Sequence, residues 1–106
     1  MSKLRAQQHQ FAMMIAHLLD FIEAYGFEVT LGDAYRDPRA TFPYGHPNSY
    51  HRRRLAQDLN LFRDGIYLVT VKDYLPVGEE WERLGGTWGG RWSPPDVPHF
   101  SLGEGR

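Results

Sequence analysis

The chain has 106 residues, of which 42% are hydrophobic, 14% aromatic and 24% charged, so we expect one compact domain over residues 1–106. A formal net charge of -1 argues against a protein that binds nucleic acid by neutralising its phosphates. The absence of cysteine excludes disulfides, thiolate zinc sites and a cysteine nucleophile. No stretch approaches the roughly 20 apolar residues that cross a bilayer, so we expect no membrane partner.

The N-terminal quarter has the pattern of an amphipathic helix. Apolar side chains recur at helical spacing from Phe11 to Tyr25, which predicts a helix over residues 3–25 with a core-packing face. Ser2 is a candidate N-cap, and Gly26 is a C-terminal stop. The apolar stretch is interrupted, and no small-residue cleavage site follows it, so we expect a cytoplasmic protein without a secretory signal.

The middle of the chain has the signals of strands around a long loop. Residues 27–31 alternate apolar and polar side chains, which predicts a half-buried strand. Residues 32–48 contain three prolines and predict a loop, and a loop of this length in a small domain is usually functional. Residues 55–62 predict a second strand, and a turn at Gly65 leads to its hairpin partner at residues 66–69.

The C-terminal part supplies a second helix and a last strand. Residues 74–84 predict a short helix that ends at the Gly85-Gly86 pair. Residues 99–102 predict a strand after a segment of turns and aromatic residues. Together these elements predict an α+β fold, in which a small antiparallel sheet packs against a long N-terminal helix.

Two groups of metal-ligand residue types lie far apart in the chain. His51 is followed by Asp58, and Asp96 is followed by His99. They offer two imidazoles and one carboxylate for a metal, and a second carboxylate for proton transfer, as in catalytic zinc sites. From the residues alone, either Asp96 or His99 can bind the metal while the other faces the bound water. The remaining histidines are read as ordinary surface or core residues: His9, His17 and His46.

The first group lies in a longer pattern, Ser49-x-His51-x-x-Arg54-x-Ala56-x-Asp58. It resembles the S-x-H-x-x-G-x-A-x-D motif of the D-alanyl-D-alanine carboxypeptidase and L-alanyl-D-glutamate endopeptidase family of zinc peptidases, which includes VanY-like and VanX-like enzymes. The departure is Arg54, which stands where the motif has glycine.

The second group also fits this family. The C-terminal site of the family's phage endolysins is similar to a box in this chain, Trp88-Gly89-Gly90-Arg91-Trp92, which is followed by Asp96-Val97-Pro98-His99-Phe100. The resemblance runs from about Val29 to Leu102 and implies a hedgehog/DD-peptidase-like fold.

The resemblance implies a role for each matching residue. It implies that His51, Asp58 and His99 bind Zn²⁺ and that Asp96 is the general base. Arg36 matches an arginine thought to stabilise the oxyanion of the tetrahedral intermediate, with an exposed loop arginine as the alternative.

Other residues are candidates for contact with substrate. Ser49 contacts the substrate or orients its neighbouring histidine, and both interpretations stay open. Trp88 and Trp92 line a groove for peptide or glycan, or else pack the small core. The basic run at residues 52–54 attracts an acidic substrate or forms a solvated face.

The resemblance implies hydrolysis of a peptide bond in the peptidoglycan stem peptide. We expect an L-alanyl-D-glutamate endopeptidase of the phage endolysin type, which acts as a monomer on the cell wall after release from the cytoplasm. A D-alanyl-D-alanine carboxypeptidase, and a non-catalytic metal-binding or virion structural domain of the same fold, are the alternatives.

Overall fold

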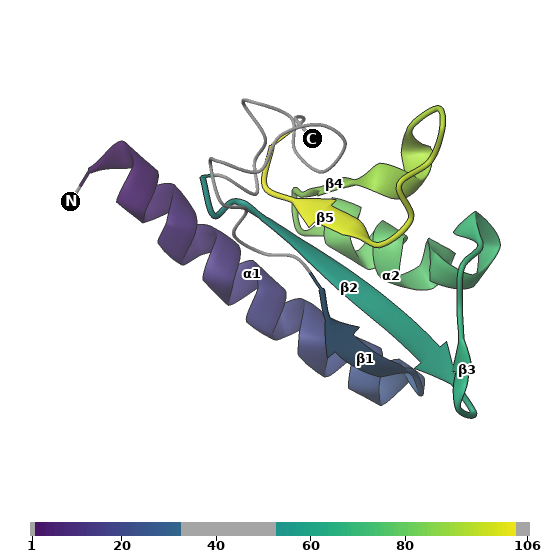
Figure 1. Cartoon of the computed structure of the whole chain (residues 1–106). Helices are drawn as coiled ribbons and strands as arrows, with labels where there is room; N and C mark the ends of the chain where they lie inside the picture. The colour runs from purple at the N-terminus through teal and green to yellow at the C-terminus, as the bar shows by residue number, and fades with distance from the viewer. Residues whose placement is uncertain (1, 33–52, 104–106) are drawn as a thin grey trace.

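The computed structural model describes residues 2–32 and 53–103 (Figure 1). Its elements are, in chain order, α1 (Lys3–Tyr25), β1 (Glu28–Leu31), β2 (Ala56–Arg63), β3 (Ile66–Tyr67), α2 (Val71–Arg83), β4 (Thr87–Trp88), the 3₁₀ turn η1 (Gly89–Arg91) and β5 (His99–Ser101). The predicted α+β class, with a small antiparallel sheet and two helices, is confirmed. Nearly all of the predicted loop at residues 32–48 lies outside the described residues.

Helix α1 has the predicted bounds because both of its ends are capped. The Ser2 hydroxyl accepts a hydrogen bond from the Arg5 amide at 3.1 Å. Gly26 follows the helix with a φ of 104°, a left-handed conformation that glycine adopts at little cost. Neither described helix combines the length and the apolar character that a bilayer-spanning segment needs.

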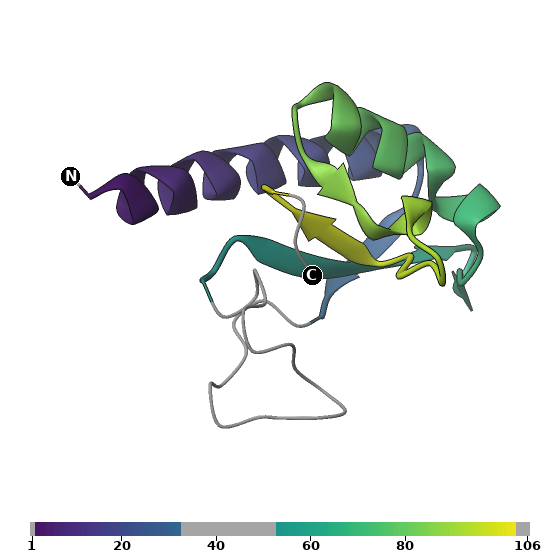
Figure 2. The same ribbon diagram turned by 90° about the horizontal axis from the view of Figure 1, so that it is seen from above.

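Strand β2 is the centre of the sheet. The strand order is β1-β2-β5-β4, and β3 pairs with the end of β2; all described pairings are antiparallel. Both helices cover one face of this sheet (Figure 2). Leu59 and Leu61 of β2 are fully buried, whereas Asp58, Asn60 and Phe62, which alternate with them, are half-buried. The alternating residues therefore point to the face that no described helix covers, which we call the open face.

Three elements differ from the sequence prediction by more than one residue. Helix α2 begins at Val71 rather than at residue 74, because the Thr70 hydroxyl accepts a hydrogen bond from the Asp73 amide at 3.1 Å and caps the helix earlier. Strand β4 was not predicted. It is defined by its pairing with β5, in which Trp88 lies opposite Phe100. The predicted hairpin is confirmed, although β3 is shorter than expected.

Glu80 joins the two helices through a cluster of charged groups. Its carboxylate lies 2.9 Å from Nε2 of His17 on α1 and 2.6 Å from a guanidinium nitrogen of Arg83 on α2. Hydrogen bonds from Arg83, and then from His17, hold the pKa of Glu80 at about 2, below its usual value of 4.5, although burial acts in the opposite direction.

The Glu80 cluster makes the stability of the fold depend on pH. Because the pKa is lower in the folded state, the carboxylate stabilises the fold above about pH 5, and this contribution is lost as the pH falls towards about 2. We expect Glu80→Gln to lower the free energy of unfolding at pH 7 by about 1 kcal/mol, measured by urea denaturation, because its partners are half-exposed.

The exposed neighbour Glu79 offers a matched control, and Glu79→Gln should leave the free energy of unfolding nearly unchanged. The difference between wild type and Glu80→Gln should shrink between about pH 5 and about pH 2. A difference of the same size at both ends of that range would contradict this assignment.

Candidate metal centre

Asp58 and His99 are direct partners across the β2–β5 pairing. The Cβ atoms of opposed residues in antiparallel strands lie about 4.5–5.5 Å apart, and their side chains share one face. Oδ1 of Asp58 and Nε2 of His99 are both buried atoms. The side chains of Asp58 and His99 thus start from adjacent positions on the open face, and a carboxylate with an imidazole is a donor set that fits Zn²⁺.

Gly32 follows β1 and lies beside Asp58 on the other side of β2. Its amide donates a hydrogen bond to the Asp58 carbonyl at 2.8 Å. A Cβ atom at this position would lie 3.0 Å from the Cβ of Asp58 and 3.3 Å from Nδ2 of Asn60. Glycine therefore lets β1 pair closely here and keeps the space next to Asp58 clear of a side chain.

Trp92 packs against the imidazole of His99. The two ring centroids lie 4.6 Å apart with the planes inclined at 44°, and only 1% of His99 is exposed. Trp92 itself is half-buried. Trp92, which was predicted to contact substrate, therefore restricts the orientation of His99, a predicted metal ligand, as residues around metal sites commonly do.

Asp96 is held close to His99 by the backbone. Its amide donates to the Gly89 carbonyl at 2.8 Å, and its own carbonyl accepts from the His99 amide at 3.2 Å. A Cβ atom on Gly89 would overlap the Asp96 carbonyl and lie 2.9 Å from the Cβ of His99. Gly89 is thus a site residue that the sequence analysis missed, although the double glycine in the aromatic box was the signal. Asp96 is exposed.

Trp88 has none of its surface exposed. Its indole Nε1 donates to the Val97 carbonyl at 2.8 Å, and a Cβ atom on Gly78 of α2 would overlap its ring. Of the two interpretations that the sequence allowed, this placement corresponds to core packing. Through the bond to Val97, Trp88 supports the turn between Asp96 and His99 from within the core.

Three predicted site residues, Arg36, Ser49 and His51, lie outside the described residues. Within residues 2–32 and 53–103, no group of three or more His, Asp or Glu side chains is close enough to hold a metal ion. Of the predicted metal ligands, the described part of the chain contains Asp58 and His99, and the roles of all the predicted site residues stay predictions.

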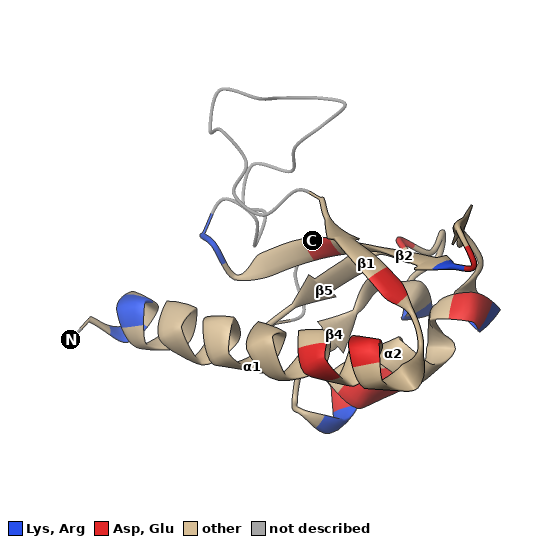
Figure 3. Ribbon diagram, turned by 90° about the horizontal axis from the view of Figure 1, so that it is seen from below, with Lys and Arg blue, Asp and Glu red and all other residues tan. Residues whose placement is uncertain are grey.

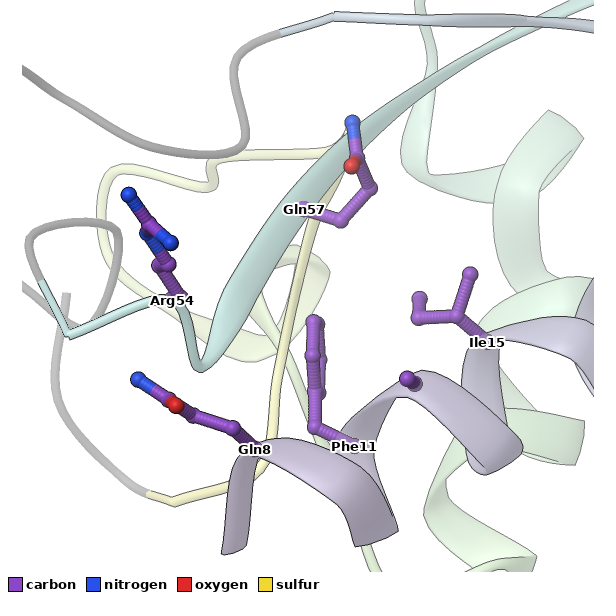
Figure 4. Close-up of a pocket in the computed structure, with 6 residues that line it drawn as sticks. Gln8, Phe11, Ile15, Arg54 and Gln57 are labelled. Atoms are coloured by element: carbon purple, nitrogen blue, oxygen red, sulfur yellow. The ribbon is translucent and has the colours of Figure 1, made fainter. Parts of the chain in front are cut away.

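Arg54 has a φ of 58°, in the left-handed region where glycine is favoured. The backbone thus keeps the conformation that explains a glycine in the motif, and an arginine adopts it here. With Gln8, Phe11 and other residues of α1, Arg54 and Gln57 line a pocket of about 370 Å³ (Figure 4). This pocket lies on the helix side of β2, because Gln57 and Asp58 point to opposite faces.

Arg54→Gly tests this backbone conformation. The left-handed conformation costs a residue with a side chain about 1–2 kcal/mol, which glycine would avoid. Glycine loses more conformational entropy on folding, and this offsets about 0.5–1 kcal/mol of the gain. We expect the free energy of unfolding to rise by about 0.5 kcal/mol, measured by chemical denaturation. Arg63→Gly, at an exposed strand residue without a positive φ, should lower it. Equal losses in both variants would rule out strain at Arg54.

Comparison with known families agrees with this geometry. A family model described as D-alanyl-D-alanine carboxypeptidase matches residues 44–102. The match contains both described ligand candidates, Asp58 and His99, as well as Asp96. A comparison with curated proteins gave no match. Because the matched segment is more than half of the chain, the chain belongs to the D-alanyl-D-alanine carboxypeptidase family of peptidases.

Proposed function

We propose that the chain is a zinc-dependent peptidase that hydrolyses a peptide bond in the peptidoglycan stem peptide. Membership of a peptidase family that acts on peptidoglycan supports the substrate class. The observation that carries the proposal is the direct pairing of Asp58 with His99, whose backbone amide donates to the carbonyl of Asp96. Two metal-ligand types, and a carboxylate that can accept a proton, thus belong to connected parts of the matched segment.

Asp58 and His99 would hold the metal ion together with His51. The chemistry that bound Zn²⁺ supplies is polarisation of the scissile carbonyl and a lower pKa, about 7, for the attacking water. Trp92 keeps the imidazole of His99 in one orientation through its ring contact, so that less ordering is needed when the ion binds.

Asp96 is the proposed general base and then the general acid. Its exposed carboxylate takes a proton from the attacking water and delivers it to the leaving amine, so no covalent intermediate forms. The backbone bonds to Gly89 and His99 hold it beside the metal ligands during both transfers. Arg36 would donate hydrogen bonds to the oxyanion of the tetrahedral intermediate.

Substitutions should separate metal binding from turnover. We expect Asp96→Asn to bind zinc like the wild type while the rate of peptide hydrolysis falls by about 10²–10⁴-fold, because the amide cannot accept the proton. His99→Ala should lose both zinc and activity, because a ligand is removed. Metal content after dialysis and peptide hydrolysis would be measured on the same samples. Wild-type turnover in Asp96→Asn would refute the proposed base.

The bond that is cut defines the finer proposal. We propose an L-alanyl-D-glutamate endopeptidase of the endolysin type, supported by the likeness of the Trp88–Trp92 box to the C-terminal site of those enzymes. The description of the matching family favours the alternative, removal of terminal D-alanine.

Digestion of purified peptidoglycan, followed by mass spectrometry of the products, tests the bond specificity. The endopeptidase predicts new N-terminal D-glutamate on released peptides and intact D-alanine ends. Release of D-alanine alone would contradict it and support the carboxypeptidase. A protein that binds zinc and cuts neither bond would be a non-catalytic member of the fold.

A further inference from the structure

The open face of the sheet continues beyond the candidate metal centre in ordered rows. Asn60 lies two residues along β2 from Asp58 and is paired with Thr30 of β1. Strand residues two apart point to the same face and are about 6.8 Å apart. A peptide that reaches the Asp58–His99 pair can therefore extend along β2 over this row.

The last row places a carboxylate beside two aromatic rings. Phe62 of β2 is paired with Glu28 of β1 on one side and with Tyr67 of β3 on the other. The rings of Phe62 and Tyr67 have centroids 5.3 Å apart, and the Tyr67 hydroxyl lies 3.5 Å from Oδ1 of Asn60. Glu28 is exposed, and 51% of Tyr67 is exposed, so this row is accessible among the described residues.

Among the described residues of β1 and β2, the charged side chains on the open face are acidic. Glu28 is the acidic position on β1, and Asp58 is the acidic position on β2 (Figure 3). Arg63, the basic residue of β2, lies over the ring of Phe27, with its guanidinium carbon 4.2 Å from the ring centroid. Because Arg63 alternates with Phe62, its side chain points to the opposite face and does not neutralise Glu28.

We propose that Glu28, Asn60, Phe62 and Tyr67 form a subsite for a free amine of the peptide substrate. An ammonium group has three donors, and it is attracted both by a carboxylate and by the faces of aromatic rings. The subsite offers the carboxylate of Glu28, oxygens of Asn60 and Tyr67, and the rings of Phe62 and Tyr67. An acidic group would be repelled by Glu28 at the same place. The inference rests on the proposed function, because that function supplies a peptide as the ligand.

The test uses a stem-type tripeptide of L-alanine, D-glutamate and L-lysine, blocked at its N-terminus, with the lysine amine either free or acetylated. Binding is measured by calorimetry to the full chain carrying Asp96→Asn, so that the peptide is not consumed. We expect the free-amine peptide to bind about 3- to 10-fold more tightly than the acetylated one. In a chain that also carries Glu28→Gln, this preference should fall to less than about twofold.

Glu79→Gln is the matched control, because Glu79 is exposed but lies on α2. It should keep the full preference. Equal binding of the two peptides, or a preference that Glu28→Gln does not change, would overturn the subsite. Hydrolysis by the protein without these substitutions is measured separately. Cleavage without an amine preference would contradict the subsite alone. An amine preference without cleavage would support the subsite and contradict the peptidase proposal.

Discussion

The antiparallel register between β2 and β5 is the constraint on which the rest of the structure depends. It places Asp58 opposite His99 on the open face and Gln57 opposite Phe100 on the helix face. Because strand side chains alternate, a slip of one residue would turn Asp58 towards the helices and Leu59 towards solvent. Leu59 and Phe100 are fully buried, so packing of the core requires the same register that pairs Asp58 with His99.

Local signals were sufficient for most of the fold. The bounds of α1 follow from Ser2, Gly26 and helical periodicity, all of which act within a few residues. The early start of α2 was not predicted, although Thr70 was a readable cap. Strand β4 could not be predicted locally, since a two-residue strand is defined by its partner β5.

The site was predictable as a set of residue types and only partly as a geometry. The spacing of the two groups identified Asp58 and His99, which the fold does bring together. The sequence could not distinguish Trp88 from Trp92, because their different depths result from packing against α2 and against His99, respectively. The requirement for Gly89 likewise depends on how closely the Asp96 turn approaches it. The double glycine indicated a close approach, but the segment that approaches it is set by the fold.

The central claim is that the β2–β5 pairing holds a metal ion between residues far apart in the sequence. A crystal structure of the full chain grown with Zn²⁺, with diffraction recorded on both sides of the zinc absorption edge, tests it most directly. The expected result is one anomalous peak with Oδ of Asp58 at about 2.0–2.2 Å and a nitrogen of His99 at about 2.0–2.1 Å. A fully occupied zinc ion bound elsewhere, with Asp58 and His99 not coordinating, would contradict the claim.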